Sequence, residues 1–287
     1  MESSNHATDV PSPLVVFLYR VYVKLTGWLY PRRTALTFFG CEFNCDVRDH
    51  LQKRIYFFKT WEPELSSFMI ERLRPGDVAV DVGGNVGYFT TLMSRLVGRD
   101  GRVVSVEASL PTFELLKETV TRNQCENVTA VNVAVSDRKG QVDLFRSPSD
   151  GRNLGMVAVR KRTDSIKVCT VDCDRFFDII GDLAGDVSFV KVDIEGAERP
   201  LLEDILARKD TLKRPFTLVA EISLSNRELI SDFASAGFKC AFLRNNYDFA
   251  FYMTCSRGGK SRHYHKLEEI PNSPFGEIEG DFVFILE

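Results

Sequence analysis

The sequence lacks three features that would each point to a particular class of protein. It has seven cysteines, an odd number, and no cleavable signal pattern, so we expect no disulfide framework and a cytoplasmic protein. Its formal net charge is −3, which gives no basic surplus for binding nucleic acid, and we expect no nucleic-acid partner. Arg20 and Lys24 interrupt the apolar stretch 14–30, so this stretch is not expected to cross a membrane.

Two pairs of cysteines have a spacing that a zinc site could use. Three residues separate Cys41 from Cys45, and three separate Cys169 from Cys173. Structural zinc sites more often use tighter pairs with a shared turn, and the second pair lies in a strand-like stretch. We therefore interpret these thiols as small buried hydrophobic side chains.

Length and composition indicate one folded domain with appendages. With 287 residues, 44% of them hydrophobic, the chain can bury a substantial core. Residues 1–13 are polar and contain proline, which is typical of a mobile terminus. We assign 14–60 to a helical, aromatic-rich extension and lead-in, and 61–287 to the main domain.

The segment 14–30 is apolar and aromatic, with a narrow polar stripe that contains Arg20 and Lys24. Arg32 and Arg33 follow it. A helix of this composition could cover its own domain, contact a second subunit or lie on an anionic membrane surface. We expect the segment to mediate association, either as a homo-oligomer contact or as a peripheral membrane contact.

Short apolar runs alternate with helical patterns along most of the chain. This alternation is typical of an α/β fold with a doubly wound, mostly parallel sheet, here of seven strands. Two further segments, 143–146 and 168–171, are interpreted as extra strands or an insertion. The predicted strands are 78–82, 102–107, 128–135, 188–194, 217–222, 239–243 and 282–286, and the predicted helices include 110–123, 196–208 and 226–237.

The first predicted strand carries the most informative pattern of the chain. Asp81 lies near its end, and a glycine turn follows before an amphipathic helix. Glycines allow a tight curve and close approach of a ligand, and a helix N-terminus offers free amide groups. The pattern predicts a nucleoside-like ligand at the residues Asp81, Gly83, Gly84, Asn85 and Gly87.

Two later strands supply further candidate contacts to this nucleoside. Glu107 ends the second strand, at a distance along the chain that is typical of an acidic side chain bonding a ribose diol. Ser136 follows the third strand and could bond the exocyclic amine of a base. The strand ends are therefore predicted to converge on one nucleoside.

The glycine spacing helps to identify the ligand. A dinucleotide site favours G-x-G-x-x-G, whereas these glycines stand at 83, 84 and 87, with Asp81 before them. This pattern fits S-adenosylmethionine better and resembles the class I methyltransferases. Two alternatives stay open, a nicotinamide-dependent (NAD-type) oxidoreductase on the same scaffold and a non-catalytic interaction protein that keeps the cofactor fold.

Later segments make the resemblance more specific. Together with DVGGNVG at 81–87, the stretches 127–145, 168–177 and 188–202 resemble the FkbM family of methyltransferases, and the similarity covers about 55–223. The resemblance implies a Rossmann-like fold and S-adenosylmethionine as cofactor. It also implies O-methylation of a hydroxyl on a small-molecule or saccharide acceptor, such as a sugar, a glycolipid or a natural product.

A hydroxyl acceptor needs either a general base or a divalent cation such as Mg²⁺ to help it lose its proton. Asp193 follows one core strand and Glu221 ends the next, so parallel pairing would bring the two carboxylates together. The pair could act as a base or as ligands of the cation. Capping of the following helix is the structural alternative.

His263 and His265 are rival bases, because a neutral imidazole suits proton abstraction near pH 7. They lie in one of two long polar loops, near 147–167 and 255–280. In an open α/β sheet such loops lie beside the ligand, so we expect both to cover the acceptor.

Overall fold

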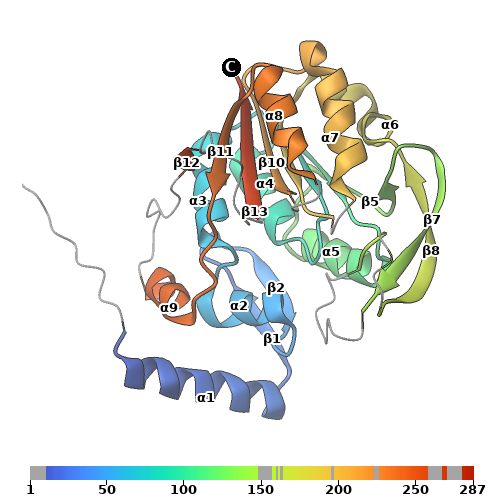
Figure 1. Ribbon diagram of the computed structural model, residues 1–287. Coiled ribbons are helices and arrows are strands. Elements are labelled where there is room, and N and C mark those ends of the chain that lie inside the picture. Colours follow the sequence, from blue (N-terminus) through green and yellow to red (C-terminus); the bar gives the residue numbers. More distant parts are fainter. Residues whose placement is uncertain are drawn as a thin grey trace, which may run out of the picture.

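A computed structural model describes most of the chain. It has a central eight-stranded sheet with helices on both faces, a separate three-stranded sheet at one edge and an N-terminal layer below them (Figure 1). The α/β, doubly wound architecture expected from the sequence is thereby confirmed. The described residues are 11–147, 157–159, 161, 164–194, 197–222, 226–257, 267–269 and 280–287.

The central sheet is parallel in its middle and antiparallel at one edge. Its strands are β3 (Val78–Val82), β4 (Arg102–Val106), β5 (Val128–Val131), β9 (Val187–Val192), β10 (Phe216–Ile222), β11 (Lys239–Leu243), β12 (Leu267–Glu269) and β13 (Gly280–Leu286). They stand in the order β12-β11-β13-β10-β9-β3-β4-β5, with β10 through β5 parallel. β13 runs antiparallel to both its neighbours, and the short β12 adds an eighth strand to the seven expected.

One predicted strand, 128–135, divides between two sheets. The separate sheet has the order β6-β8-β7 and comprises β6 (Ala134–Val135), β8 (Ile166–Asp174) and β7 (Gly140–Arg146). Between β5 and β6, the side-chain amide of Asn132 donates to the carbonyls of Glu107 at 2.8 Å and Ala108 at 3.0 Å. The chain is thus tied to the loop after β4 and leaves the central sheet, so the single long strand was a wrong expectation.

Helices pack on both faces of the central sheet because its side chains alternate between the faces. These helices are α3 (Pro63–Arg72), α4 (Tyr88–Val97), α5 (Leu110–Arg122), α6 (Phe176–Ile180), α7 (Glu198–Ala207) and α8 (Glu228–Ser235). A further helix, α9 (Phe249–Arg257), lies with the N-terminal layer below the sheet (Figure 1). Val80 and Val82 share a core cluster with α6, α7 and α8. Ala79 lies in the opposite cluster, with α3 and α4.

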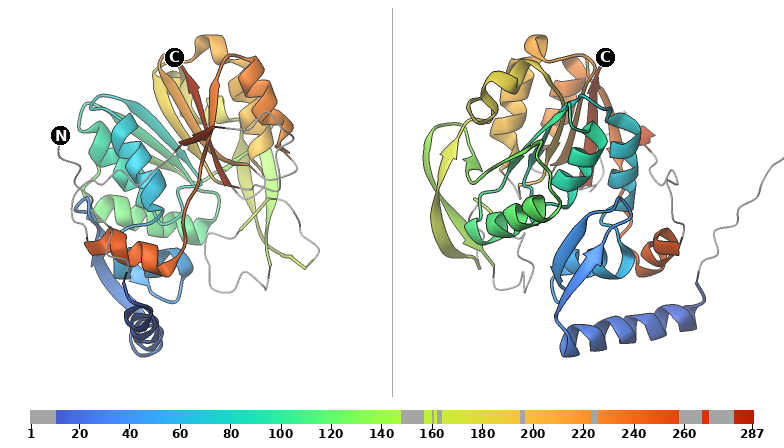
Figure 2. Two further views of the ribbon diagram at one scale, coloured as in Figure 1. Left: turned by 60° about the vertical axis from the view of Figure 1, so that its left-hand side comes forward. Right: turned by 180° about the vertical axis from the view of Figure 1, so that it is seen from behind.

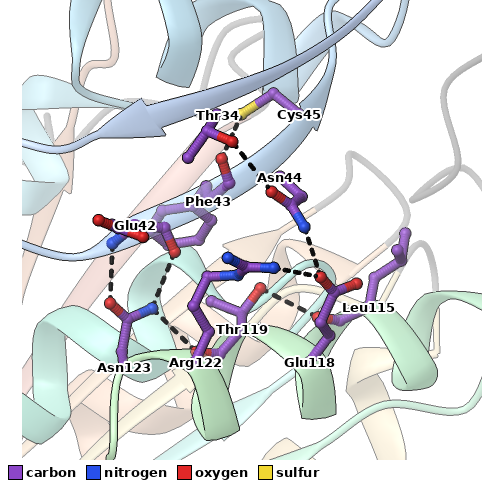
Figure 3. Close-up of polar contacts among 10 residues, drawn as sticks. All are labelled: Thr34, Glu42, Phe43, Asn44, Cys45, Leu115, Glu118, Thr119, Arg122 and Asn123. Atoms are coloured by element: carbon purple, nitrogen blue, oxygen red, sulfur yellow. Dashed lines mark hydrogen bonds and ion pairs between the residues drawn. The ribbon is translucent and has the colours of Figure 1, made fainter.

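The N-terminal layer is joined to the main domain through one core. Its elements are α1 (Pro13–Leu29), β1 (Arg32–Leu36), β2 (Glu42–Asp46) and α2 (His50–Phe58). The antiparallel β1–β2 hairpin lies on the end of α5, where Asn123 exchanges two hydrogen bonds with the backbone of Glu42 and Asn44 donates to Glu118 (Figure 3). Side chains of the hairpin and α2 are buried in the same cluster as α3 and α4.

The helix α1 lies at the periphery, with the hairpin and α2 between it and the central sheet (Figures 1 and 2). One side of α1 packs against the rest of the protein. Val23 and Thr26 are buried, and the Tyr19 ring contacts Phe57 and Phe249. Among the helices of the described residues, none is both long enough and apolar enough to cross a membrane.

All seven cysteines are free thiols. Cys41, Cys45 and Cys173 are buried, as predicted for small hydrophobic side chains, whereas Cys169 is only half-buried. Both Cys169 and Cys173 lie on β8, and Cys169 is the one nearer to the exposed first half of that strand.

Candidate functional site

A cavity of about 270 Å³ lies at the carboxyl ends of the parallel strands. Gly83 and Asn85 line it from the turn after β3, and Glu107 from the loop after β4. Asp193 lines it from the end of β9 and Glu221 from β10. Ligands of open α/β sheets bind at this edge, so the cavity is the candidate functional site. These strand ends therefore meet at one cavity, and the binding of a nucleoside there stays a prediction.

The glycines of the turn are required mainly by packing within the protein. Gly83 has φ +84°, and a Cβ atom there would lie 1.8 Å from the carbonyl oxygen of Asp193. A Cβ on Gly84 would lie 2.3 Å from the hydroxyl of Ser105. Gly87 has φ +88° and is the N-cap residue of α4, a left-handed conformation that glycine adopts without strain. Gly83 therefore lies between the cavity and the next strand, whereas Gly84 is needed for contact with β4.

Asp81 lies behind the turn rather than on the cavity wall. Its side chain is fully buried and accepts a hydrogen bond from the Thr90 hydroxyl at 2.6 Å. Its other oxygen, Oδ1, has no hydrogen bond within the described residues and lies 3.7 Å from the Lys191 ammonium. Burial raises the pKa of Asp81, and Lys191 opposes this rise. Asp81 thus connects β3, α4 and β9 beneath the turn.

Glu107 has the geometry expected of a ribose ligand. Its Oε2 accepts from the Asn85 backbone N–H at 3.0 Å, and its Oε1 accepts from that of Ser109 at 2.8 Å. Burial raises the pKa of Glu107 to about 6 despite these two bonds. Each carboxylate oxygen can accept a further hydrogen bond, so a diol could still bind at this wall.

Lys191 is a buried cation beside the cavity, in contact with Asp193 and the glycine turn, and the sequence analysis assigned it no role. It is buried on β9, with its ammonium 3.1 Å from Asp193 Oδ2 and 3.4 Å from the Gly83 carbonyl. Burial alone would lower the pKa of Lys191, but the carboxylates of Asp193, Asp81 and Glu62 raise it above its usual value. Lys191 therefore stays charged and holds Asp193 against the glycine turn.

Asp193 and Glu221 leave neighbouring parallel strands in register, as the sequence predicted. Ala220 pairs with Val192, so Glu221 and Asp193 are the next residues along their strands. Both line the cavity. The expected cation has no support, because the described part of the chain contains no group of three or more His, Cys, Asp or Glu residues arranged for a metal ion. The Lys191 ammonium already neutralises Asp193.

Glu62 lines the site although it was not selected as a site residue from the sequence. Its buried carboxylate lines the cavity and accepts a hydrogen bond from the Tyr247 hydroxyl at 2.7 Å. Burial raises the pKa of Glu62 well above its usual value, and the nearby Asp281 and Asp193 add to the rise. Its backbone is left-handed, with φ +38°, a conformation that a non-glycine residue rarely adopts and that composition does not reveal.

Asp281 completes a cluster of acids around Lys191. It lies on β13 and accepts a hydrogen bond from the Asn245 side chain. Burial raises the pKa of Asp281 to about 6, and the charge of Asp193 adds to the rise. Lys191 is therefore the one lysine among four buried or half-buried carboxyl groups, those of Glu62, Asp81, Asp193 and Asp281. Such a site favours a positively charged ligand.

The remaining predicted residues have different outcomes. Ser136 follows β6, and its hydroxyl bonds Asp137, while the preceding Ala134 and Val135 line the cavity. Contact of Ser136 with a base stays a prediction. His263 and His265 lie outside the described residues.

The two predicted covering loops are only partly described. Val157 and Val159 line the cavity from the loop near 147–167, which agrees with a covering role for that loop. Most of the loop near 255–280 lies outside the described residues. His50, which was not selected as a site residue, also lines the cavity, and burial lowers its pKa to about 4, with the charge of Arg54 adding to the effect.

Two relatives are similar to a short part of the chain. A protein-L-isoaspartate O-methyltransferase of Thermotoga maritima is 40% identical over 72 residues, which is 24% of this chain and 23% of the relative. A protein of the same description from Caenorhabditis elegans is 31% identical over 74 residues, which is 26% of this chain and 33% of the relative. The matches thus span about a third of these relatives or less.

A solved structure and a family model extend the comparison. The structure of Aeropyrum pernix fibrillarin with natively bound S-adenosyl-L-methionine aligns with a TM-score of 0.42 at 12% identity, covering 77% of this chain and 73% of that one. The model of the methyltransferase FkbM domain matches residues 81–249, more than half of the chain. This match includes the glycine turn, Glu107, Lys191, Asp193 and Tyr247, and the chain therefore belongs to the FkbM methyltransferase family.

Proposed function

We propose that this protein is an S-adenosylmethionine-dependent methyltransferase that methylates a hydroxyl group of a sugar, a glycolipid or a natural product. The observation that carries the proposal is the two-sided cavity. The glycine turn and Glu107 form one wall. Glu62, Asp193 and Glu221 line the other, and Lys191 lies beside Asp193. The acceptor class follows from the family resemblance, and the cluster of carboxylates gives it a chemical basis.

The first wall fits the nucleoside of S-adenosylmethionine. The two oxygens of Glu107 are held in place by backbone N–H groups, which leaves them oriented for the ribose hydroxyls. The apolar side chains of Val106 and Val135 also line the cavity and could pack on the adenine ring. The turn brings backbone atoms of Gly83 and Asn85 to the same wall.

The second wall fits the reacting groups. S-adenosylmethionine supplies a methyl group on a positively charged sulfur, and this charge is lost when the methyl group leaves. Glu62, Asp193 and Asp281 provide negative charge beside the cavity, so they would favour the sulfonium over the neutral thioether product. Glu62 is protonated more readily than an exposed carboxyl group, and a bound cation would favour its ionised form.

Asp193 is the proposed general base. Its side chain is 39% exposed, lines the cavity and is oriented by Lys191 at 3.1 Å. An oriented carboxylate can accept the proton of an acceptor hydroxyl during transfer, when the hydroxyl becomes much more acidic. Glu221 lies beside it at the end of the next strand and is the proposed contact to another hydroxyl of the acceptor.

The experiment is to incubate the full chain with S-adenosylmethionine labelled in its methyl group and an extract of candidate glycans and glycolipids. We expect label in a product whose new methyl ether is found by mass spectrometry. Calorimetry with S-adenosylmethionine provides a separate test of cofactor binding. Absence of any binding would contradict the cofactor assignment, and label only on nitrogen or on a carboxyl group would contradict the acceptor assignment.

A further inference from the structure

The outer side of α1 is a fixed apolar surface. Trp28 is 80% exposed, Leu14 is 66% exposed and Phe17 is 61% exposed. Leu18, Tyr22 and Leu25 are also exposed on this helix. A helix of 17 residues is about 25 Å long, so this outer side is a long stripe rather than one isolated side chain.

The opposite side of α1 holds the helix in place. The Tyr19 hydroxyl donates to the Phe57 carbonyl, and the Tyr19 ring packs against Phe57 and Phe249. The Arg20 guanidinium lies over the ring of Phe249 at 5.3 Å. The apolar stripe is therefore the exposed side of an anchored helix, which lies at the periphery of the protein (Figure 2).

The surroundings of the stripe are basic. No acidic residue occurs in 13–41, whereas Arg20, Lys24, Arg32 and Arg33 all fall within it. A groove of about 730 Å³ also runs between α1, α2 and α9. Its described lining contains the cations Arg20, Lys24, Arg48, Lys53 and Arg54 and a single acid, Asp248.

We propose that α1 docks the protein on an anionic lipid bilayer, with its apolar stripe in the interface and its cations at the level of the phosphate groups. An aromatic and aliphatic face flanked by lysine and arginine is the composition that such interfacial helices use. A second copy of the chain fits less well, because pairing the stripes would bring equal positive charges together. The basic groove and the candidate functional site share His50 and Tyr247, so the docked surface adjoins the site.

Sedimentation of the full chain with vesicles tests this proposal. We expect binding to vesicles of phosphatidylcholine with phosphatidylglycerol, much weaker binding to phosphatidylcholine alone, and loss of binding in high salt. Trp28→Ser and Phe17→Ser should each lower the partition coefficient roughly tenfold. Ile166→Ser is the matched control, because Ile166 is 64% exposed on β8, and it should change nothing.

The charges are tested in the same assay. Lys24→Gln and Arg32→Gln should each reduce binding to anionic vesicles about fivefold. Lys139→Gln, in the exposed turn before β7, is the control for a lost charge elsewhere. Equal binding to both kinds of vesicle, or none to either, would overturn the proposal. A dimer that Trp28→Ser dissociates, with no vesicle binding, would assign the stripe to a second copy instead. Calorimetry with S-adenosylmethionine on the same variants separates these outcomes from failure of the proposed function.

Discussion

The two walls of the cavity are assembled from the chain in different ways. The wall formed by the glycine turn and Glu107 uses residues from 83–107, and the Glu107 carboxylate is held by nearby backbone N–H groups. The opposite wall gathers Glu62 and Asp193 from distant segments, with Lys191 and Asp281 close to them, and leaves several carboxyl groups near one another.

The two walls differ in how well the folded protein stabilises the charged form of their carboxyl groups. The Glu107 carboxylate receives two backbone hydrogen bonds, which favour its charged form and offset part of the cost of its burial. The acids of the opposite wall share one lysine, so their mutual repulsion and burial are offset only in part. We expect the first wall to be preformed and the second to gain most when a positively charged ligand binds.

The largest effect is expected where the two walls meet. Gly83→Ala should lower the free energy of unfolding by at least about 3 kcal/mol, because its Cβ would lie 1.8 Å from the Asp193 carbonyl oxygen and φ is +84°. Urea denaturation measures the effect. Gly185→Ala is the control, since a Cβ there meets nothing within 4 Å. Equal stability of the two variants would show that the walls are not rigidly packed together.

The next largest effect is expected for Asp193, the proposed general base on the second wall. Asp193→Asn should lower the turnover number about 100-fold or more, because an amide cannot take the hydroxyl proton, while the affinity for S-adenosylmethionine changes little. Single-turnover assays and calorimetry measure the two quantities. Asp232→Asn, on the exposed side of α8, is the control. Undiminished turnover in Asp193→Asn would remove this residue from the proposed mechanism.

Glu107→Ala should mainly weaken the binding of S-adenosylmethionine, whereas Asp193→Asn should mainly lower turnover. Glu107→Ala removes the proposed ribose contact, so the affinity for S-adenosylmethionine should fall by about 1.5 to 3 kcal/mol. Calorimetry measures this loss, and circular dichroism checks that the fold is intact after Asn85 and Ser109 lose their acceptor. Unchanged affinity would mean that the nucleoside lies elsewhere.

The smallest effect is the pH dependence of the second wall. Because the pKa of Asp281 is raised from 3.8 to about 6, the folded state holds a proton that the unfolded state loses. Its contribution therefore favours the folded state at low pH and is lost as the pH rises from about 4 to about 6.

Asp281→Asn should abolish this loss of folding stability at higher pH. The full shift corresponds to about 3 kcal/mol, and solvent screening at the half-buried Asp281 lowers this, so the variant should gain roughly 1 to 2 kcal/mol of stability relative to wild type between pH 4 and pH 7. Urea denaturation across this range, with Asp232→Asn as control, isolates the contribution from that of other groups such as His50, whose lowered pKa has the opposite sign. Parallel curves for wild type and Asp281→Asn would show that the pKa of Asp281 is not raised.

The sequence by itself determined the first wall, because its signals are local. The strand Val78–Val82, the glycine turn and the start of α4 are consecutive, and their conformations follow from burial and from φ values that glycine favours. Asp193 and Glu221 could also be predicted, since parallel strands end at one edge.

Only the tertiary structure decided the rest. Asn132 redirects the chain through side-chain bonds to the loop after β4, so a continuous apolar pattern divides between two sheets. Glu62 meets Tyr247, and Lys191 meets Asp81, across elements whose packing no local pattern specifies. Which carboxyl groups share a cation is set by long-range contacts, and burial there changes their pKa values in ways that residue type alone does not.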